Sequence, residues 1–436
     1  NLFTGPLYFV YKILHAIKLA AHLNLEMPTY HFVPVFYMGS EDADFSELNH
    51  FTVEGKRYEW HTNQTGAVGR MKVDQSLLDL IEELNGQLSI HSFGNEWIEM
   101  LRSAFQKGTS VQDATFQLVD KLFGDYGLVV LIADVPALKK TMSTNFEQDL
   151  FDHTPARMVQ KTNAMLNQQY EAQAHVRDIN LFYFKDAIRE RIERAGEGFI
   201  VCNTNIKFSS EELKVELEQY PERFSPNVIL RGIYQESILP NIAFIGGGGE
   251  IAYWLQFKEL FDYYKVAFPI LILRNSFIVI ERKWEEKIQK LNMAIADIFN
   301  DAEELFNEKV KHQSKLALKL NGKIEALSGL YMSIKDQASS VDPTLQVHVQ
   351  ALEKQAIYKL HKLENKMLRA EKRKFDETRK QIAFLKSSLF PKNGLQERVE
   401  NISYYYAKYG KGIIDAFYQH SLATEQEFTI LKQVSG

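Results

Sequence analysis

The chain has 436 residues, of which 45% are hydrophobic and 25% charged, a composition typical of a globular protein with two or three domains. A net charge of −5 argues against broad electrostatic binding to nucleic acid. The single cysteine, Cys202, excludes an intrachain disulfide and a cysteine-rich metal site. Without a membrane-spanning run or a signal-peptide pattern, we expect a cytoplasmic protein that binds no membrane. Because Asn1 stands directly before a dense motif, we also expect residues upstream of it.

The first predicted element is a helix. Thr4-Gly5-Pro6 is a helix-start signal, with a capping residue followed by a proline in the first turn, and the apolar residues from Leu7 to Ala21 mark one helical face. Lys12 lies two turns into this helix, where it could counter an anion near the helix start or be an ordinary surface lysine. A predicted strand, Tyr30–Met38, follows and leads into an acidic loop.

The acidic loop Ser40–His50 places several carboxylates just beyond that strand. Such groups could bind Mg²⁺, accept a proton from an amine, or hydrogen-bond a substrate. The competing interpretation is a solvated helix entry, in which acidic side chains favour the positive end of the helix dipole. A lone histidine such as His50 is more often structural than catalytic. The candidates in this loop are Glu41, Asp42, Asp44, Asn49 and His50.

Further apolar runs at Gly127–Ala133 and Phe268–Leu273 are also predicted strands. Short, nearly continuous hydrophobic runs are typical of a parallel sheet buried on both faces, and such sheets bind ligands at the carboxyl ends of their strands. We therefore predict an α/β fold in which the acidic loop, Asp134, a glycine run and Arg274-Asn275-Ser276 share one rim. Arg274 could clasp an anion with two parallel hydrogen bonds or form an ion pair at the sheet edge.

The glycine run, Gly246–Gly249, separates the β-prone run Ile242–Ile245 from a helical pattern that opens at Glu250. Consecutive glycines cost backbone entropy, so side chains must be unfavourable there. Backbone N–H groups and a helix N-terminus can hold a phosphate or carboxylate, whereas the spacing of a dinucleotide fingerprint is missing, so NAD is not expected. The predicted substrate- or anion-contacting residues outside the acidic loop are Thr4, Gly5, Tyr8, Gly246, Gly247, Gly248, Gly249, Glu250, Tyr253, Arg274, Asn275 and Ser276.

The chain changes character at Trp284. Apolar residues recur at alternating spacings of four and three through Leu305, which is a heptad seam, and a weaker pattern continues through Leu316, Leu320 and Leu327. After a turn at 339–343, a second helical pattern runs to Leu389. We predict a core over 1–280 with inserted, helical segments at roughly 75–215, an antiparallel coiled-coil hairpin over 281–390, and a segment 391–436 that packs back on the core.

Several segments together resemble one family, the cysteine-adding enzymes (cysteine ligases) of bacillithiol biosynthesis. Tyr37 stands where the family often has tryptophan, and Ala43 stands where a histidine is common, so attention moves to Asp42, Asp44 and His50. The matching segments, in order along the chain, are LFTGPLYFVYK (2–12), PVFYMGSEDADFSELNH (34–50), DINLFYFKDAIRERI (178–192), RFSPNVILRGIYQESILPNIAFIGGGGEIAYWLQFK (223–258), PILILRNSF (269–277) and LFPKNGLQERVENI (389–402).

The resemblance implies a Rossmann-like core, a long coiled coil that supports homodimerisation, and condensation of L-cysteine with glucosaminyl-malate to give bacillithiol. It also implies an adenine nucleotide, ATP or ADP, bound near the coiled coil; a role for Mg²⁺ stays open. The residues expected to contact the nucleotide are Trp254, Lys258, Pro391, Gly394, Gln396 and Arg398.

Amide formation in water needs an activated carboxyl group and a deprotonated amine. We therefore expect cysteine to react as an acyl-adenylate or acyl-phosphate, with Lys12 among the groups that hold anions and with Asp42, Asp44 or His50 accepting the amine proton. Two other classes stay open: a nucleotide-binding scaffold whose coiled coil recruits partners, and a nucleotidyltransferase or sugar-nucleotide enzyme using the same rim.

Overall fold

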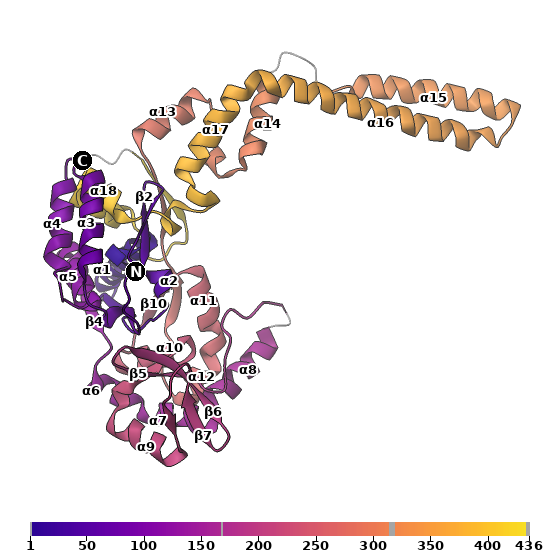
Figure 1. Ribbon diagram of the computed structural model, residues 1–436. Helices are drawn as coiled ribbons and strands as arrows, with labels where there is room; N and C mark the ends of the chain where they lie inside the picture. Colours follow the sequence, from indigo (N-terminus) through magenta and orange to yellow (C-terminus); the bar gives the residue numbers. More distant parts are fainter. Residues whose placement is uncertain (1, 167–168, 314–318, 433–436) are drawn as a thin grey trace. The chain divides into compact units, whose positions relative to one another are not determined.

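The computed structural model describes residues 2–166, 169–313 and 319–432 (Figure 1). Asn1 and Leu316, which entered the predictions above, lie outside these ranges. The chain divides into two compact units, of which the larger comprises Asn1–Val279 with Gly394–Gly436 and the smaller comprises Ile280–Asn393.

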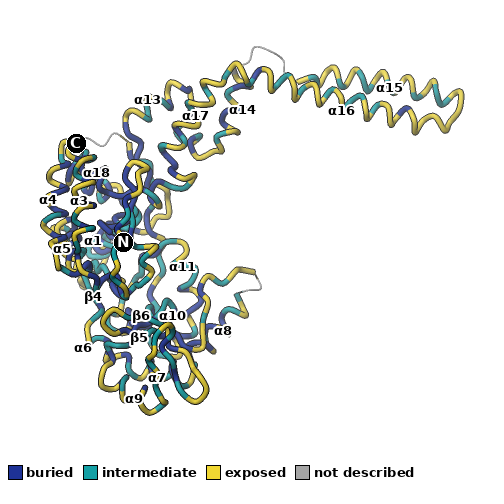
Figure 2. Tube along the Cα trace, in the orientation of Figure 1, coloured by how far each residue is buried: buried dark blue, intermediate teal, exposed yellow. Residues whose placement is uncertain are grey.

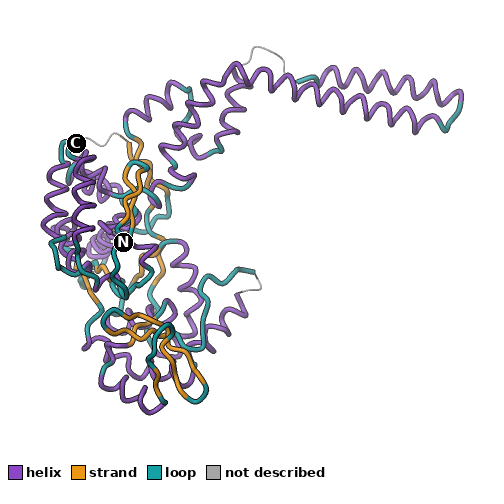
Figure 3. Tube along the Cα trace, viewed as in Figure 1, coloured by secondary structure: helices purple, strands orange, loops and turns teal. Residues whose placement is uncertain are grey.

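The larger unit combines helices with short strands (Figure 3). Its helices are α1 (Tyr8–Glu26), α2 (Phe45–Leu48), α3 (Gln75–Leu88), α4 (Gly94–Ala104), α5 (Val111–Phe123), α6 (Pro136–Lys139), α7 (Ser143–Asp152), α8 (Thr154–Leu166), α9 (Ser210–Gln219), α10 (Val228–Ile238), α11 (Gly248–Trp254), α12 (Lys258–Tyr264), α18 (Ile402–Tyr409) and α19 (Lys411–His420). Its strands outside the inserted sheet are β1 (Val35–Met38), β2 (His50–Val53), β3 (Lys56–Glu59), β4 (Val129–Ile132), β10 (Ala243–Gly246), β11 (Ile270–Leu273), β12 (Ser276–Ile280) and β13 (Phe428–Lys432).

The apolar runs form parallel strands, as the sequence predicts. β1 pairs in parallel with β4, with Val35 opposite Val129, and β10 pairs in parallel with β11, with Ala243 opposite Ile270. These are two separate strand pairs, and β12 pairs with β13 in another. The acidic loop therefore follows the first parallel pair, and the glycine run follows the second.

The segment between these pairs is helical only in part. After α3, α4 and α5, an antiparallel five-stranded sheet forms in the order β8-β7-β6-β5-β9. Its strands are β5 (Leu181–Lys185), β6 (Ile188–Ala195), β7 (Gly198–Val201), β8 (Lys207–Phe208) and β9 (Phe224–Pro226). β5 is largely apolar and β6 is rich in charged residues, and successive side chains of each strand point to opposite faces of the sheet. Asp186, with φ of +52°, makes the turn that joins these two strands.

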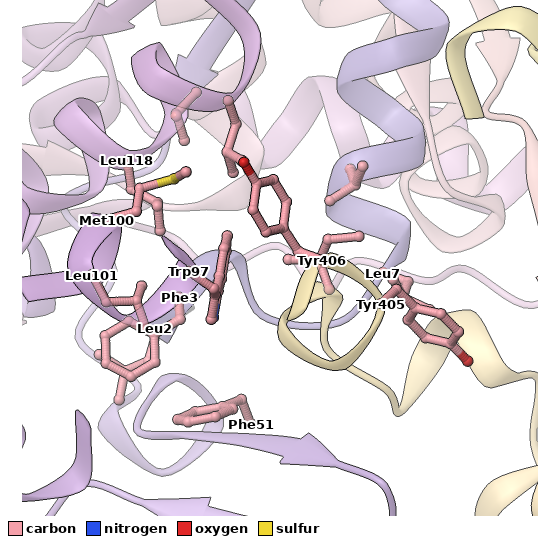
Figure 4. Packing of buried hydrophobic residues seen from close by; sticks show 14 of the residues in the cluster. Leu2, Phe3, Leu7, Phe51, Trp97, Met100, Leu101, Leu118, Tyr405 and Tyr406 are labelled. Carbon is pink, nitrogen blue, oxygen red and sulfur yellow. The ribbon is translucent and has the colours of Figure 1, made fainter. Parts of the chain in front are cut away.

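Two apolar clusters form the core of the larger unit. In the first, Phe3 meets Phe51 with ring centroids 5.1 Å apart, and Trp97 meets Tyr406 at 5.0 Å (Figure 4). Tyr406 belongs to α18, so the C-terminal segment packs among the N-terminal helices. The second cluster gathers α7, the inserted sheet and α10–α12. Burying one such aromatic side chain contributes roughly 1.5–3 kcal/mol.

The smaller unit is helical. Exposed residues follow both long helices of its hairpin, α15 and α16 (Figure 2). The hairpin turn contains Asp342, whose carboxylate accepts the Thr344 backbone N–H at 2.8 Å. The helices of this unit are α13 (Arg282–Lys290), α14 (Ala302–Gln313), α15 (Asn321–Val341), α16 (Leu345–Lys372) and α17 (Asp376–Leu389).

The predicted continuous seam from Trp284 to Leu305 is wrong, because the helix is interrupted. α13 ends at Lys290, Asn292 has φ of +48°, and α14 begins only at Ala302. Between them, the Asp297 carboxylate accepts the Ala294 N–H at 2.8 Å, which starts a short 3₁₀ turn. Such a side chain offers the backbone a hydrogen bond that competes with the continuing helix.

Candidate functional site

A cavity of about 610 Å³ lies in the larger unit, a volume in the range of small-molecule sites. Residues of β1 and β10 line it, together with residues of α1, α10 and α11. Most of the lining is apolar. Its polar lining includes Lys12, Arg231, Gln235, Glu250 and Tyr253. One strand of each parallel pair, β1 and β10, therefore borders the cavity, whereas the residues predicted to share one rim (the acidic loop, Asp134, Gly246–Gly249 and Arg274–Ser276) are not among its lining.

Glu250 links the first helix to the glycine run. The Lys12 Nζ donates to both carboxylate oxygens of Glu250, at 2.7 and 2.8 Å, and the Gly247 N–H donates to Glu250 Oε2 at 2.8 Å. Lys12 thus contacts a carboxylate of α11, whereas the sequence predicted that its amine would reach over the start of its own helix. In this structure the anion on the Gly247 N–H is the protein's own carboxylate.

The four glycines have different surroundings. The helix opens at Gly248, two residues before the predicted start. A Cβ at Gly246 would lie 2.8 Å from the Phe244 ring, so packing explains that glycine. A Cβ at Gly248 or Gly249 would meet nothing within 4 Å. Packing therefore gives no reason for glycine at these two positions, and the backbone there is open to approach.

Arg274-Asn275-Ser276 connects the second strand pair to the C-terminal segment. Arg274 forms an ion pair with Glu397 at 2.7 Å, and the two side chains are only 7% and 1% exposed. The Asn275 N–H donates to His15 Nδ1 at 3.1 Å, and its side-chain amide donates to the Leu422 carbonyl at 2.9 Å. Ser276 Oγ donates to the same Glu397 carboxylate at 3.3 Å. Of the two interpretations of Arg274, anion binding or an ion pair within the protein, the structure therefore has the ion pair.

The acidic loop divides between two kinds of contact. Asp42 forms a two-fold hydrogen-bonded ion pair with Arg231, which lines the cavity. Asp44 instead caps α2, accepting the Ser46 hydroxyl at 2.8 Å and the Glu47 N–H at 3.4 Å. Asp44 therefore acts as a helix cap, which was the alternative to a chemical role for this carboxylate.

The end of this loop is tied to the β2–β3 hairpin. The buried Asn49 donates from its side-chain amide to Glu59 at 3.1 Å, and His50 Nδ1 lies 3.2 Å from Asn49 Oδ1. Neither Asn49 nor His50 lines the cavity.

A buried charge cluster lies at the carboxyl ends of β1 and β4. Arg70 binds both oxygens of Asp134 at 2.6 and 2.7 Å, while Lys139 forms ion pairs with Glu41 and, at 3.3 Å, with Asp134. Lys139 is fully buried. Burial raises the pKa of Glu41, and Lys139 opposes this shift by favouring the carboxylate. Burial also raises the pKa of Tyr37, which lies among these charges.

The Thr4 motif is strained and does not cap α1. Phe3, Thr4 and Gly5 have φ values of +46°, +73° and +66°, and the helix begins only at Tyr8. Positive φ is unfavourable for a β-branched residue such as Thr4. The Asn401 amide donates to the carbonyls of Phe3 and Gly5, at 2.8 and 2.6 Å, and holds this conformation. The buried Thr4 hydroxyl has no hydrogen-bond partner in the described chain. Strain of this kind is concentrated at functional sites.

The residues expected to hold a nucleotide are mostly engaged otherwise. Trp254 is buried and stacks on Phe244 with centroids 4.2 Å apart, and Gln396 binds the backbone N–H of Val279 at 2.9 Å. Lys258 pairs with Asp262 one turn along α12. Pro391 belongs to the smaller unit, Gly394 is partly buried, and Arg398 is exposed. Trp254 and Gln396 thus have partners within the protein, and their predicted contact with a nucleotide stays a prediction.

Sequence reasoning missed Arg70, Lys139 and Arg231. Each lies outside the glycine, acidic and heptad patterns, and only tertiary contacts bring it to the carboxylates. Within residues 2–166, 169–313 and 319–432, no three His, Cys, Asp or Glu side chains gather as metal ligands. In the same ranges no helix is long and apolar enough to cross a membrane.

Comparison with known proteins is consistent along the chain. Residues 1–275 match the model for the N-terminal Rossmann-like domain of bacillithiol biosynthesis BshC, and residues 277–433 match its C-terminal coiled-coil domain. The chain is 38% identical over 436 residues to a protein of Christiangramia forsetii and 40% identical over 433 residues to one of Flavobacterium psychrophilum. Each alignment covers 99% of this chain and 81% of the relative, and both relatives are named Putative cysteine ligase BshC. The predicted Rossmann-like and coiled-coil organisation is confirmed.

Proposed function

Because the chain belongs to the BshC family of bacillithiol biosynthesis and is a cysteine-adding ligase, we propose that it joins the carboxyl group of L-cysteine to the amine of glucosaminyl-malate. The bond formed is an amide and the product is bacillithiol. The cysteine carboxyl loses an oxygen to an activating group, and the amine loses a proton to a base.

The observation that carries the proposal is the cavity of about 610 Å³ bordered by β1 and β10, one strand of each parallel pair. It combines apolar walls with a polar lining that includes the Lys12–Glu250 ion pair and Arg231, whose ion-pair partner Asp42 lies outside the lining. The substrates carry carboxylates and an ammonium, and paired charges of both signs can exchange partners with them. The open backbone at Gly248 and Gly249 leaves room for such a ligand beside Glu250.

Among the three candidate bases, Asp42 has the best support. Its partner Arg231 lines the cavity, whereas Asp44 caps a helix and His50 contacts Asn49. In the proposed reaction Asp42 accepts the amine proton while Arg231 orients the carboxylate. Lys12 holds a substrate carboxylate after that group displaces Glu250. A general base contributes roughly 10²–10⁴-fold to the rate.

We also propose that the protein acts as a homodimer through the α15–α16 hairpin and uses an adenine nucleotide to activate cysteine. Large apolar side chains on the hairpin face solvent: Met332 is 68% exposed, Val347 72% and Tyr358 60%. If these side chains belong to one surface, a second copy of the chain could cover it. The nucleotide proposal is supported by the resemblance, and no contact to it is assigned to Trp254 or Gln396.

The test is mass-spectrometric detection of bacillithiol from cysteine and glucosaminyl-malate, with and without ATP. Single-turnover rates of Asp42→Asn are compared with those of Asp44→Asn. We expect at least a hundredfold loss for Asp42→Asn and a much smaller loss for Asp44→Asn. Failure to incorporate cysteine under every condition, with pyrophosphate released from another substrate, would identify a transferase instead. An undiminished Asp42→Asn rate would exclude Asp42 as the base.

A further inference from the structure

One face of the inserted sheet is directed at the charge cluster beyond β1 and β4. The Arg70 guanidinium lies 3.7 Å from the Phe184 ring centroid, and the Lys139 ammonium lies 4.9 Å from it. Phe184 is paired with Arg189 in the β5–β6 ladder. Because directly opposed residues of antiparallel strands project to the same face, Arg189 is on the face that meets the cluster.

Arg189 is held rigidly on that face. Its Nε donates to the hydroxyl of Ser225 at 3.1 Å, and its guanidinium carbon lies 4.0 Å from the Phe182 ring centroid. Ser225 is fully buried, and it is paired with Phe182 in the β5–β9 ladder. These two contacts restrain the guanidinium, and among the described residues its two terminal nitrogens donate no hydrogen bond.

The charges of this region do not balance. Asp134 is taken by Arg70, Glu41 by Lys139, and Asp42 by Arg231, while in the described chain no carboxylate lies within ion-pair distance of Arg189. The charge cluster and its neighbours Asp42, Arg189 and Arg231 therefore contain three carboxylates and four cations. The carboxylates are Glu41, Asp42 and Asp134, and the cations are Arg70, Lys139, Arg189 and Arg231.

Arg189 interacts electrostatically with the neighbouring charged groups. Asp42 and Glu41 favour the charged form of Arg189, and Arg231 disfavours it; the largest effect is burial, which lowers the pKa of Arg189 to about 10. A partly buried guanidinium without a counter-charge is unfavourable, and a bound anion would remove that cost.

We propose that Arg189 anchors an anionic group of the substrate, a carboxylate or a phosphate, with its two terminal nitrogens beside the Arg231–Asp42 pair. The identity of the anion rests on the proposed function. In that reaction the malate group supplies carboxylates, and a nucleotide supplies phosphates. The inserted sheet thereby contributes a binding residue to a rim otherwise built from the parallel strands and their loops.

The experiment measures anion binding by calorimetry, which requires no turnover. L-malate and glucosaminyl-malate form one arm, and inorganic phosphate and ATP form the other. Arg189→Gln removes the charge and keeps a polar side chain. The matched control is Arg191→Gln, an exposed arginine on the same strand and face. A second variant, Arg189→Lys, retains the charge but not the planar pair of donors.

We expect Arg189→Gln to weaken binding at least tenfold in one arm, and the affected arm identifies the group as carboxylate or phosphate. Arg189→Lys should weaken the same arm severalfold, and it serves alone if Arg189→Gln does not fold. Arg191→Gln should bind as the unmodified protein does. Undiminished binding by Arg189→Gln in both arms, equal losses in Arg189→Gln and Arg191→Gln, or no anion binding by the unmodified protein would overturn the proposal. A protein that binds through Arg189 but makes no bacillithiol would refute the proposed function alone.

Discussion

Lys12 and Glu250 contact each other across 238 residues of sequence, with the ammonium 2.7 and 2.8 Å from the two carboxylate oxygens. The same carboxylate accepts the Gly247 N–H at 2.8 Å, so one ion pair joins α1, the glycine run and the polar lining of the cavity.

The first prediction concerns the strength of this pair. Because its side chains are 31% and 35% exposed, we expect Lys12→Met and Glu250→Gln each to lower the free energy of unfolding by about 0.5–1 kcal/mol. In urea unfolding the double variant should lose less than the sum of the single losses. Strict additivity would show that the two side chains do not interact in solution.

The pair between Arg274 and Glu397 should behave differently, because it is buried. Removing one partner leaves an uncompensated buried charge, so Arg274→Gln should lower the free energy of unfolding by about 3–5 kcal/mol. Arg282→Gln is the control, since its ion pair with Glu286 is 84% and 51% exposed. A loss below about 1 kcal/mol for Arg274→Gln, comparable with an exposed pair, would favour a ligand-binding role for Arg274.

Asp149 predicts a dependence of stability on pH. Burial raises the pKa of its carboxyl from 3.8 to about 7. Between these values the unfolded chain is ionised while the folded protein keeps the proton. The contribution of Asp149 is therefore complete below pH 4 and is lost as the pH rises towards 7, by at most about 1.4 kcal/mol per pH unit. Asp149→Asn should flatten this slope in urea unfolding at pH 4–8. Asp152→Asn, an exposed change on the same helix, should not.

Asn401 tests the strained motif at Phe3–Gly5. The Asn401 side chain caps the start of α18 by accepting the Ser403 N–H, and Asn401→Asp keeps that acceptor. The same change removes the amide donor that binds the Phe3 and Gly5 carbonyls. We expect a loss of stability of about 2–4 kcal/mol and, because the conformation of Thr4 depends on this donor, a large loss of ligase activity. Asn401→Ser, which also caps helices, should be milder. Equal stability of Asn401→Asp and the unmodified protein would contradict the clamp.

The hairpin gives a prediction about assembly. Met332→Glu and Val347→Glu place charges on exposed apolar positions of α15 and α16, where they should cost little stability in a monomer. If a second copy covers this surface, sedimentation equilibrium should show a shift from dimer to monomer. Ser333→Glu, an exposed polar neighbour, is the control. A dimer that persists in both apolar variants would place the interface elsewhere.

The predictions that succeeded depend on local patterns. The apolar runs at β1, β4, β10 and β11 became parallel strands, because short runs rich in β-branched residues favour strands. Their predicted burial on both faces is wrong, since Val129 is 48% and Ile270 64% exposed. The failures are also local in origin. The apolar residues alone predicted a continuous heptad seam, but the helix is interrupted near Asn292 and Asp297. Asn292 has a positive φ, and the Asp297 side chain offers the backbone a hydrogen bond that competes with the helix.

The sequence by itself determined the family, the α/β and coiled-coil classes, and the strand ends at which chemistry was to be sought. Only the tertiary structure decided which charges face one another there. Arg231 reached Asp42, Glu397 took Arg274, and Glu250 occupied the Gly247 N–H. Partners such as Lys12 and Glu250 are set by how distant elements pack, and a local pattern of residue types carries no information on that distance.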